Sequence, residues 1–197
     1  MRLNTLLGTA ALTLASTAAH AGALGVIGTG GMHMTKAYYY DGNGEQGIDS
    51  QMRPSGGLGL EGMLGAKDDR IVGLFRVYVL SDAPAAMPDT GDLDASEVTT
   101  PPYDTLGWEN KGVMSVGVQW TVFGDPEAFQ LVVDSMVGTG FMTSNSLEFL
   151  LVDVGPGVTY TLGDKLQLTG TLSATGRYRK GLSLGGNAYA GVRFLFD

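Results

Sequence analysis

The chain contains 197 residues, with 20 acidic and 12 basic side chains, a formal net charge of −8 and no cysteine. The lack of cysteine excludes disulfide bonds and thiolate metal sites, and the acidic balance argues against a nucleic-acid partner, which requires a basic surface. The 31 glycines, about twice the average usage, are scattered through apolar and β-branched segments, where glycine weakens a soluble sheet but suits the crowded interior of a small closed barrel.

The first 21 residues have the three parts of a secretory signal peptide. Arg2 gives a positive start, residues 6–15 are small or apolar, and the tripeptide AHA at 19–21 is a cleavage site of the A-x-A type. The segment is too short, and too rich in alanine and threonine, for a membrane-spanning helix. We therefore predict a signal peptide over 1–21 and one mature domain over 22–197.

After the signal peptide, the dominant pattern is alternation of apolar with small or polar residues, which is typical of half-buried β-strands. For example, the even positions from Met114 to Val122 are apolar, whereas the odd positions from Ser115 to Thr121 are serine, glycine, glutamine and threonine. No segment shows convincing helical periodicity. Eight segments follow the strand pattern: 22–40, 53–66, 70–81, 111–123, 128–142, 147–162, 166–179 and 185–196.

The connections between these segments alternate in character. Three are tight turns rich in aspartate, glycine and proline, at 67–69, 124–127 and 163–165. The others are 41–52, 82–110, 143–146 and 180–184, of which two are long. Short turns at one end and longer loops at the other are the layout of an outer-membrane barrel. The sequence therefore predicts an all-β fold, an eight-stranded antiparallel up-and-down transmembrane β-barrel.

Two of the predicted strands are irregular. The segment 147–162 contains Pro156, which has no N–H group to donate to a β-ladder. We therefore expect a β-bulge at Pro156. The segment 22–40 is rich in glycine, and its alternation is poor.

The chain ends NAYAGVRFLFD, where Gly191 is followed by Phe194 and Phe196 in the last predicted strand. This spacing resembles the β-signal of Gram-negative outer-membrane proteins, with the difference that Asp197 follows the final aromatic residue. Together with the signal peptide and the eight strands, the chain resembles the small outer-membrane barrels of the OmpA/OmpX-like group. The resemblance implies a location in the outer membrane of a Gram-negative bacterium, recognition by the barrel assembly machinery, and contact with outer-membrane lipid and lipopolysaccharide.

If the apolar faces of the strands meet lipid, the opposite faces fill the interior. The inward positions then carry three acids and three bases: Glu61, Arg76, Asp134, Asp153, Arg177 and Arg193. The interior of a barrel of eight strands is just wide enough to be filled by side chains, and charges buried there must pair. A balanced set favours a filled, salt-bridged interior, since an ion channel would more often carry an excess of one sign.

Aromatic residues collect at the ends of the predicted strands, among them Trp120, Phe129 and Tyr160. Their positions predict an aromatic girdle at the membrane interfaces. A carbohydrate-binding platform is the competing interpretation, but these residues are spread over different segments.

The stretch YYYDGNGEQGID, residues 38–49, has the alternating oxygen-bearing residues of a calcium loop. An EF-hand loop that began at Asp41 would need glycine at its sixth position and glutamate at its twelfth, where this chain has Gln46 and Met52. We therefore interpret the stretch as a surface turn and predict no metal site. Loose binding of divalent cations at this loop stays open.

The connection 82–110 has seven acidic residues and no basic one. A connection of this length is usually functional or disordered. One interpretation is a contact site for a protein partner in the cell envelope or for cations, and the plainer one is a solvated acidic loop. The candidate contact residues are Asp89, Asp92, Asp94 and Glu97.

The sequence predicts neither a catalytic site nor a cofactor. His33 is the only histidine after residue 21, and nothing marks a serine nucleophile beside it. The glycines of GALGVIGTGG are not a dinucleotide fingerprint, because no helix is predicted after them. A lipid-modifying enzyme that uses His33 is the least favoured hypothesis.

We therefore predict a structural or interaction protein of the cell envelope. The main alternative is a narrow pore, or a barrel that transports small hydrophobic solutes. A soluble lipocalin-like barrel would invert every face. It would hide the side chains of Phe194, Phe196, Trp120, Leu131 and Val133 and expose those of Arg193, Gln119 and Asp134.

Overall fold

The computed structural model describes residues 22–40, 46–83, 109–141, 147–178 and 182–196. The predicted signal peptide, 1–21, lies outside the described residues. The same holds for Asp197, for residues 41–45 of the calcium-like stretch, and for the four candidate contact residues of the acidic connection, Asp89, Asp92, Asp94 and Glu97.

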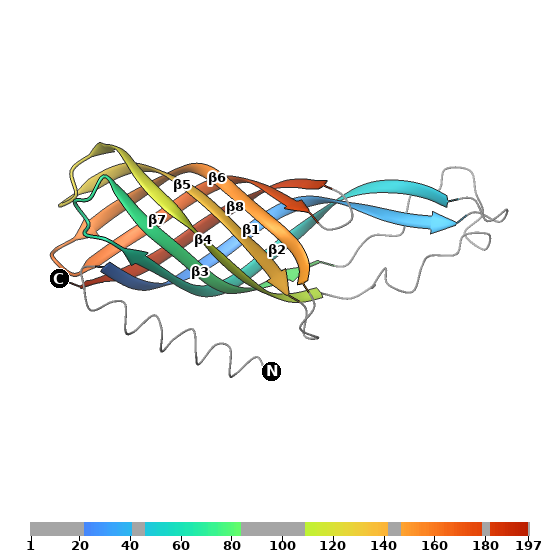
Figure 1. Ribbon diagram of the computed structural model, residues 1–197, viewed down its shortest axis with the longest axis horizontal. Coiled ribbons are helices and arrows are strands. Elements are labelled where there is room, and N and C mark those ends of the chain that lie inside the picture. Colours follow the sequence, from blue (N-terminus) through green and yellow to red (C-terminus); the bar gives the residue numbers. More distant parts are fainter. Residues whose placement is uncertain (1–21, 41–45, 84–108, 142–146, 179–181, 197) are drawn as a thin grey trace.

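The predicted fold is confirmed as an all-β, closed barrel of eight antiparallel strands in up-and-down order (Figure 1). The strands are β1 (Gly22–Tyr40), β2 (Gln46–Leu64), β3 (Ile71–Asp82), β4 (Glu109–Gly124), β5 (Phe129–Phe141), β6 (Leu147–Leu162), β7 (Leu166–Tyr178) and β8 (Leu182–Phe196). In the part of the chain that the structure describes, no helix has the length and apolar character needed to cross a bilayer.

The strands are staggered around the barrel. Stepping from Gly22 to its partner on each following strand returns to β1 at Met32, ten positions further along the chain. The partners on the way are Leu64, Gly73, Val118, Ser135, Val154, Ala174 and Gly186. Such a stagger accompanies strands tilted by about 35–45° to the barrel axis, and the tilt is visible in Figure 1.

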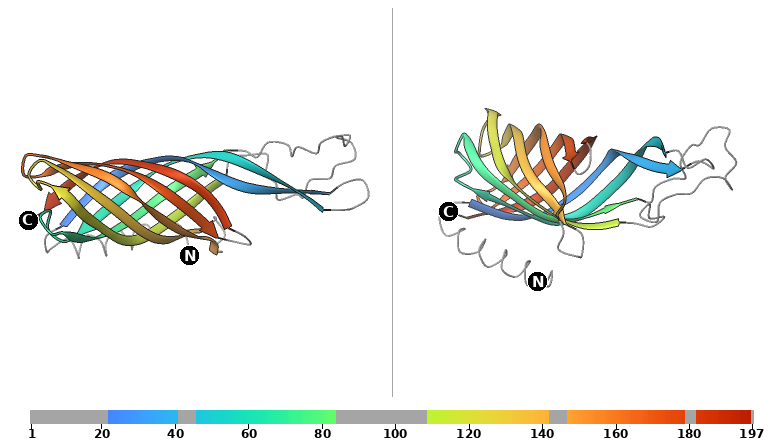
Figure 2. Two further views of the ribbon diagram at one scale, coloured as in Figure 1. Left: turned by 90° about the horizontal axis from the view of Figure 1, so that it is seen from above. Right: turned by 45° about the vertical axis from the view of Figure 1, so that its right-hand side comes forward.

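The described turns lie at the end of the barrel where Gly22 pairs with Phe196, which we call the turn end (Figures 1 and 2). They are short, as predicted, and glycine provides their geometry. Gly163 has a φ of 62°, a left-handed conformation that glycine adopts without a steric penalty. The opposite end, where β3 and β7 finish, is the loop end.

Strands β1 and β2 are longer than their neighbours. β2 begins at Gln46, seven residues before the predicted start at 53, so most of the predicted loop 41–52 is strand. Pairing of β1 with β8 ends at His33, and pairing of β2 with β3 begins at Ser55. Beyond these residues the two strands pair only with each other, and the ribbon projects past the loop end in Figure 1.

The expected bulge at Pro156 is wrong. Val154 lies opposite Ala174 and Gly157 lies opposite Thr171, so the register of β6 and β7 is the same on both sides of the proline. Pro156 therefore interrupts the ladder to β7 without adding a residue, because a missing N–H removes a hydrogen bond but does not change the register. The register shifts are in other pairs of strands, one of them at Phe123 of β4.

The alternation sorts the side chains as predicted. Leu58, Trp120 and Phe194 face outward with 76%, 54% and 56% of their surface exposed. Arg193 and Asp134 face inward and are at most 1% exposed. This placement rules out the inverted, lipocalin-like arrangement. The barrel has an apolar outer wall, and its interior holds the charged side chains together with two clusters of buried apolar side chains.

Candidate functional site in the barrel interior

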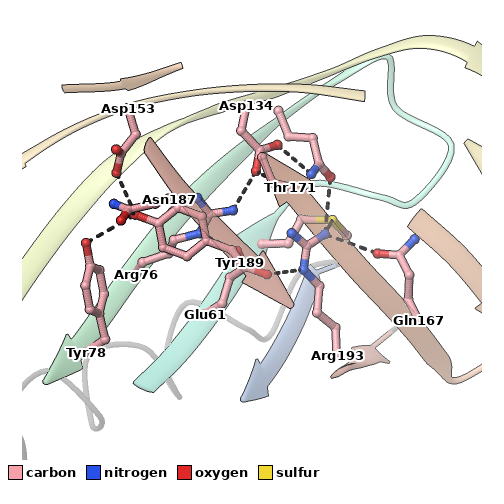
Figure 3. Close-up of polar contacts among 12 residues, drawn as sticks. Glu61, Arg76, Tyr78, Asp134, Asp153, Gln167, Thr171, Asn187, Tyr189 and Arg193 are labelled. Carbon is pink, nitrogen blue, oxygen red and sulfur yellow. Dashed lines mark hydrogen bonds and ion pairs between the residues drawn. The ribbon is translucent and has the colours of Figure 1, made fainter. Parts of the chain in front are cut away.

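The structure places all six predicted interior charges inside the barrel, each at most 7% exposed. They come from six different strands: Glu61 from β2, Arg76 from β3, Asp134 from β5, Asp153 from β6, Arg177 from β7 and Arg193 from β8. Figure 3 shows five of them meeting in the middle of the barrel.

Glu61 is the centre of the first group. It lies between Arg76 and Arg193, each of which donates through Nε to one of its oxygens, at 2.5 and 2.7 Å respectively. Arg193 also donates through Nη1 to Gln119 and Gln167, at 3.2 Å in each case. Both oxygens of this carboxylate are thus bound by charged donors, the arrangement that a buried carboxylate requires.

Asp134 is tied to the same group through Arg76, whose Nη2 donates to it at 2.5 Å. Gln119 donates to Asp134 at 2.8 Å and Thr171 at 2.9 Å. Side chains from β3, β4 and β7 therefore converge on this carboxylate of β5. Because each of these strands contributes a bonded partner, the network connects opposite walls of the barrel.

A second group surrounds Tyr189, closer to the loop end. Its hydroxyl donates to Asp153 Oδ2 at 2.8 Å, and Asn187 donates to that hydroxyl at 3.2 Å. Thr175 donates to the other oxygen of Asp153. The guanidinium of Arg76 lies 4.5 Å from the centre of the Tyr189 ring, a cation–π contact that links the two groups.

His33 lies at the edge of this second group and is 1% exposed. Its Nε2 is 3.0 Å from Asn187 Oδ1, and Asn187 Nδ2 is already donating to Tyr189, so Nε2 is the donor. Among the described residues, no hydroxyl is hydrogen-bonded to His33. The hypothesis of a lipid-modifying enzyme therefore gains no nucleophile from this part of the chain.

A third group, which sequence reasoning missed, lies at the loop end. Asp82 accepts from Lys111 at 2.9 Å and from Arg177 at 3.2 Å. The ring of Phe149 lies 5.7 Å from Lys111 Nζ and 5.2 Å from Arg177 Cζ. The predicted connection 82–110 begins at Asp82, but Asp82 is the last residue of β3. The sequence did contain a sign of this position. Asp82 is six positions after Arg76, so in a continuous strand both side chains point to the same face.

The interior charges balance once this third group is included. The described interior contains four acids and four bases: Glu61, Asp82, Asp134 and Asp153 against Arg76, Lys111, Arg177 and Arg193. Along β3 the inward side chains form layers, with Val72 and Leu74 near the turn end, then Arg76 and Tyr78, then Leu80 and Asp82. No cluster of three potential metal ligands occurs among the described residues.

The three residues of the predicted β-signal lie at the turn end of β8. Phe194 and Phe196 are on the outer wall, 56% and 41% exposed, whereas the phase of Gly191 places it on the inner side. Other outward aromatic residues near the same end form a partial ring around the barrel: Trp120, Phe123, Phe129 and Tyr160. The aromatic girdle at the membrane interfaces stays a prediction.

The interior and the outer wall are the two surfaces from which a function can be argued. The interior is an interlocked set of ion pairs and hydrogen bonds, and the outer wall is exposed and apolar. No protein-family model matches this chain, and a comparison with curated proteins finds no match. The chemistry of these two surfaces is therefore the basis for inferring a function.

Proposed function

We propose that this protein is an integral outer-membrane β-barrel that serves the cell envelope as a structural or interaction protein, with an interior filled by side chains. Its setting would be the outer membrane of a Gram-negative bacterium, in contact with outer-membrane lipid and lipopolysaccharide. The barrel assembly machinery would insert it after removal of a signal peptide. A protein of the envelope would be its partner, met at the acidic connection 82–110.

The observation that carries the proposal is the sorting of charge between the two faces. Every charged side chain that the structure describes within a strand is buried, except that of Arg53, which is partly buried. The outer wall instead exposes large apolar side chains such as Leu58 at 76% and Leu172 at 68%. Soluble monomers rarely expose a continuous apolar surface, whereas a bilayer requires one.

The dimensions and closure of the barrel also suit a bilayer. β3 has 12 residues, and a strand of this length, rising about 3.3 Å per residue at a tilt of about 40°, spans about 30 Å. That height matches the hydrocarbon core of a membrane. Closure between β1 and β8 satisfies the backbone hydrogen bonds that hydrocarbon cannot satisfy.

The filled interior favours an anchoring or interaction role over conduction. Both oxygens of Glu61 and both of Asp134 accept hydrogen bonds from other interior side chains. Moving ions through this region would require these bonds to break, at a cost that rises in a medium of low dielectric constant.

A narrow pore is the second candidate, and one observation favours it. The hydroxyls of Thr29, Ser55 and Ser173 are buried and have no hydrogen-bond partner among the described residues. They lie on β1, β2 and β7. Buried hydroxyls of this kind are commonly satisfied by water, so this side of the interior is suited to a hydrated path.

Two measurements test the proposal. Mature protein extracted in detergent should run at different positions on a gel before and after boiling, and it should fractionate with the outer membrane. Protein recovered from the soluble periplasm, without a shift, would refute the membrane proposal. In planar bilayers, the filled barrel should show no discrete openings, whereas regular openings would favour the pore.

A further inference from the structure

Arg177 differs from the other buried arginines in how its guanidinium nitrogens are used. Arg76 donates to carboxylates through Nε and Nη2, and Arg193 donates to interior side chains through Nε and Nη1. Arg177 donates only through Nη1, to Asp82. Its Nε and Nη2 are buried and meet no hydrogen-bond partner in the described structure. These two nitrogens form one edge of the guanidinium plane, so a complete two-donor edge is unpartnered.

The bond that Arg177 does make is weak for an ion pair. Its Nη1 lies 3.3 and 3.2 Å from the two oxygens of Asp82, whereas charged hydrogen bonds are usually about 2.7–2.9 Å long. Asp82 is also shared, because Lys111 donates to it at 2.9 Å. The charge of Arg177 is therefore less completely compensated than that of Arg76, which contacts two carboxylates at 2.5 Å.

The surroundings of Arg177 are apolar on one side. Its side chain is 8% exposed, and its Cζ lies 5.2 Å from the centre of the Phe149 ring. Phe149 belongs to a buried cluster with Leu80, Val113 and Leu151. Donors in such surroundings lose their water without gaining a partner, and an anion that reaches them is held strongly because the local dielectric constant is low.

We propose that the loop end of the interior binds a small oxyanion, with Arg177 Nε and Nη2 as paired donors and Phe149 as an apolar wall. A carboxylate or a phosphate group presents two oxygens that match this edge of a guanidinium. The group would be a free ion or the phosphate of a lipid headgroup. The inference goes beyond the proposed function, since it concerns the interior and holds whether the barrel anchors or conducts.

The experiment uses the full mature barrel refolded in uncharged detergent micelles and titrated calorimetrically with inorganic phosphate at constant ionic strength. The wild-type barrel should bind phosphate with saturation. Arg177→Met should weaken binding by on the order of tenfold or more, the usual effect of losing a charged hydrogen bond. Arg177→Lys keeps the charge but removes the planar edge, so it should also weaken binding.

Arg53→Met is the matched control, because it removes one guanidinium from the same end of the barrel. Both Nε and Nη2 of Arg53 donate to the carbonyl of Ala83, so this substitution should leave phosphate affinity unchanged. Each variant is first checked for the gel shift of a folded barrel. If Arg177→Met does not fold, Arg177→Lys decides in its place.

Three results would overturn the proposal: no saturable binding by the folded wild-type barrel, unchanged affinity in the folded Arg177 variants, or an equal loss in Arg53→Met. A final experiment distinguishes a lipid headgroup from a free ion as the source of the oxyanion. Both outcomes are consistent with the proposed site. Micelles that contain a short-chain phosphatidic acid should displace inorganic phosphate if the ligand is a lipid headgroup. They should leave phosphate binding unchanged if the ligand is a free ion.

Discussion

Glu61 and Arg193 are joined by a 2.7 Å hydrogen bond although the backbone of β1 runs between their strands. Both lie opposite the same residue, Gly25, one on each side. Because Gly25 has no side chain, the guanidinium of Arg193 reaches across β1 to the carboxylate. The sequence places the charges, and a glycine between them provides the space that their contact requires.

Substituting Glu61 tests the energetic importance of the first group. Glu61→Gln leaves Arg76 and Arg193 without their shared carboxylate, and breaking a buried ion pair from one side costs about 3–5 kcal/mol. We expect the urea midpoint of the folded barrel in micelles to fall accordingly, as measured by the loss of the unheated gel band.

The control for Glu61→Gln is Glu127→Gln. Glu127 pairs with Lys67 at 2.8 Å at the turn end, but its side chain is 62% exposed. Exposed pairs contribute less than about 1 kcal/mol, so this variant should keep a midpoint close to that of the wild type. Equal midpoints for the two variants would contradict a structural role for the interior pair.

Gly25→Val tests the space between the two charges. A Cβ at position 25 would overlap the carbonyl oxygen of Val192 and lie 2.8 Å from Arg193 Cα. Both atoms are backbone, so the strand itself must move, and overpacking of this kind costs about 1–3 kcal/mol. We expect a lower urea midpoint and slower refolding.

Gly28→Val is the matched control on the same strand. The atoms nearest to a Cβ at position 28 would be Leu58 Cδ2, at 3.6 Å, and two backbone oxygens at 3.9 and 4.0 Å, which are ordinary contacts. Gly28 faces outward in the alternation, so an apolar side chain there would face lipid. We expect this variant to fold as the wild type does; a loss as large as that of Gly25→Val would show that β1 rejects any side chain.

Leu58→Arg tests the membrane proposal from the outer wall. Leu58 lies midway between Leu64 and Met52 on β2 and is 76% exposed. An arginine at the middle of a bilayer destabilises a barrel by about 2–4 kcal/mol, whereas an exposed position on a soluble protein tolerates charge. We expect reduced folding into lipid vesicles. Asp68→Arg, in the exposed turn after β2, should fold normally, and equal folding of both variants would argue against insertion.

Phe196→Ala tests whether the barrel assembly machinery recognises the last strand. Phe196 is 41% exposed on the outer wall, and Phe129 is 44% exposed at the same end, so the two alanine variants lose similar contacts. We expect Phe196→Ala to reduce the folded protein in cells well below Phe129→Ala, while both purified chains refold alike in detergent. If the two variants decrease equally in cells, the resemblance of the C-terminus to a β-signal has no role in assembly.

Strand identity and facing direction could be predicted from the sequence because both depend on alternation alone. Arg76, Asp134 and Arg193 were assigned inward from phase, and each lies inside. The predicted positions of the strand ends were less accurate. β2 starts at Gln46 and β8 at Leu182, in stretches where glycine and charged residues obscured the pattern.

The partners of the interior charges could not be predicted, because pairing depends on how far each strand is shifted against the next. Glu61 meets Arg193 from two strands away, and Arg76 meets Asp134 from two strands away as well. Alternation gives only a direction for each side chain. Tyr189 connects two of the polar groups, but the alternation showed only that its side chain points inward and gave no indication of its partners.

The sorting of side chains has a consequence for how this chain changes over evolutionary time. Outward positions such as Leu58 and Leu172 need only be apolar, so they can exchange among leucine, valine, isoleucine and phenylalanine with little selection. Inward positions such as Glu61 and Arg193 are fixed by their bonded partners. Overall identity should therefore decay quickly while the spacing of the inward residues persists, and distant relatives should be easier to detect from every second residue than from the whole strands.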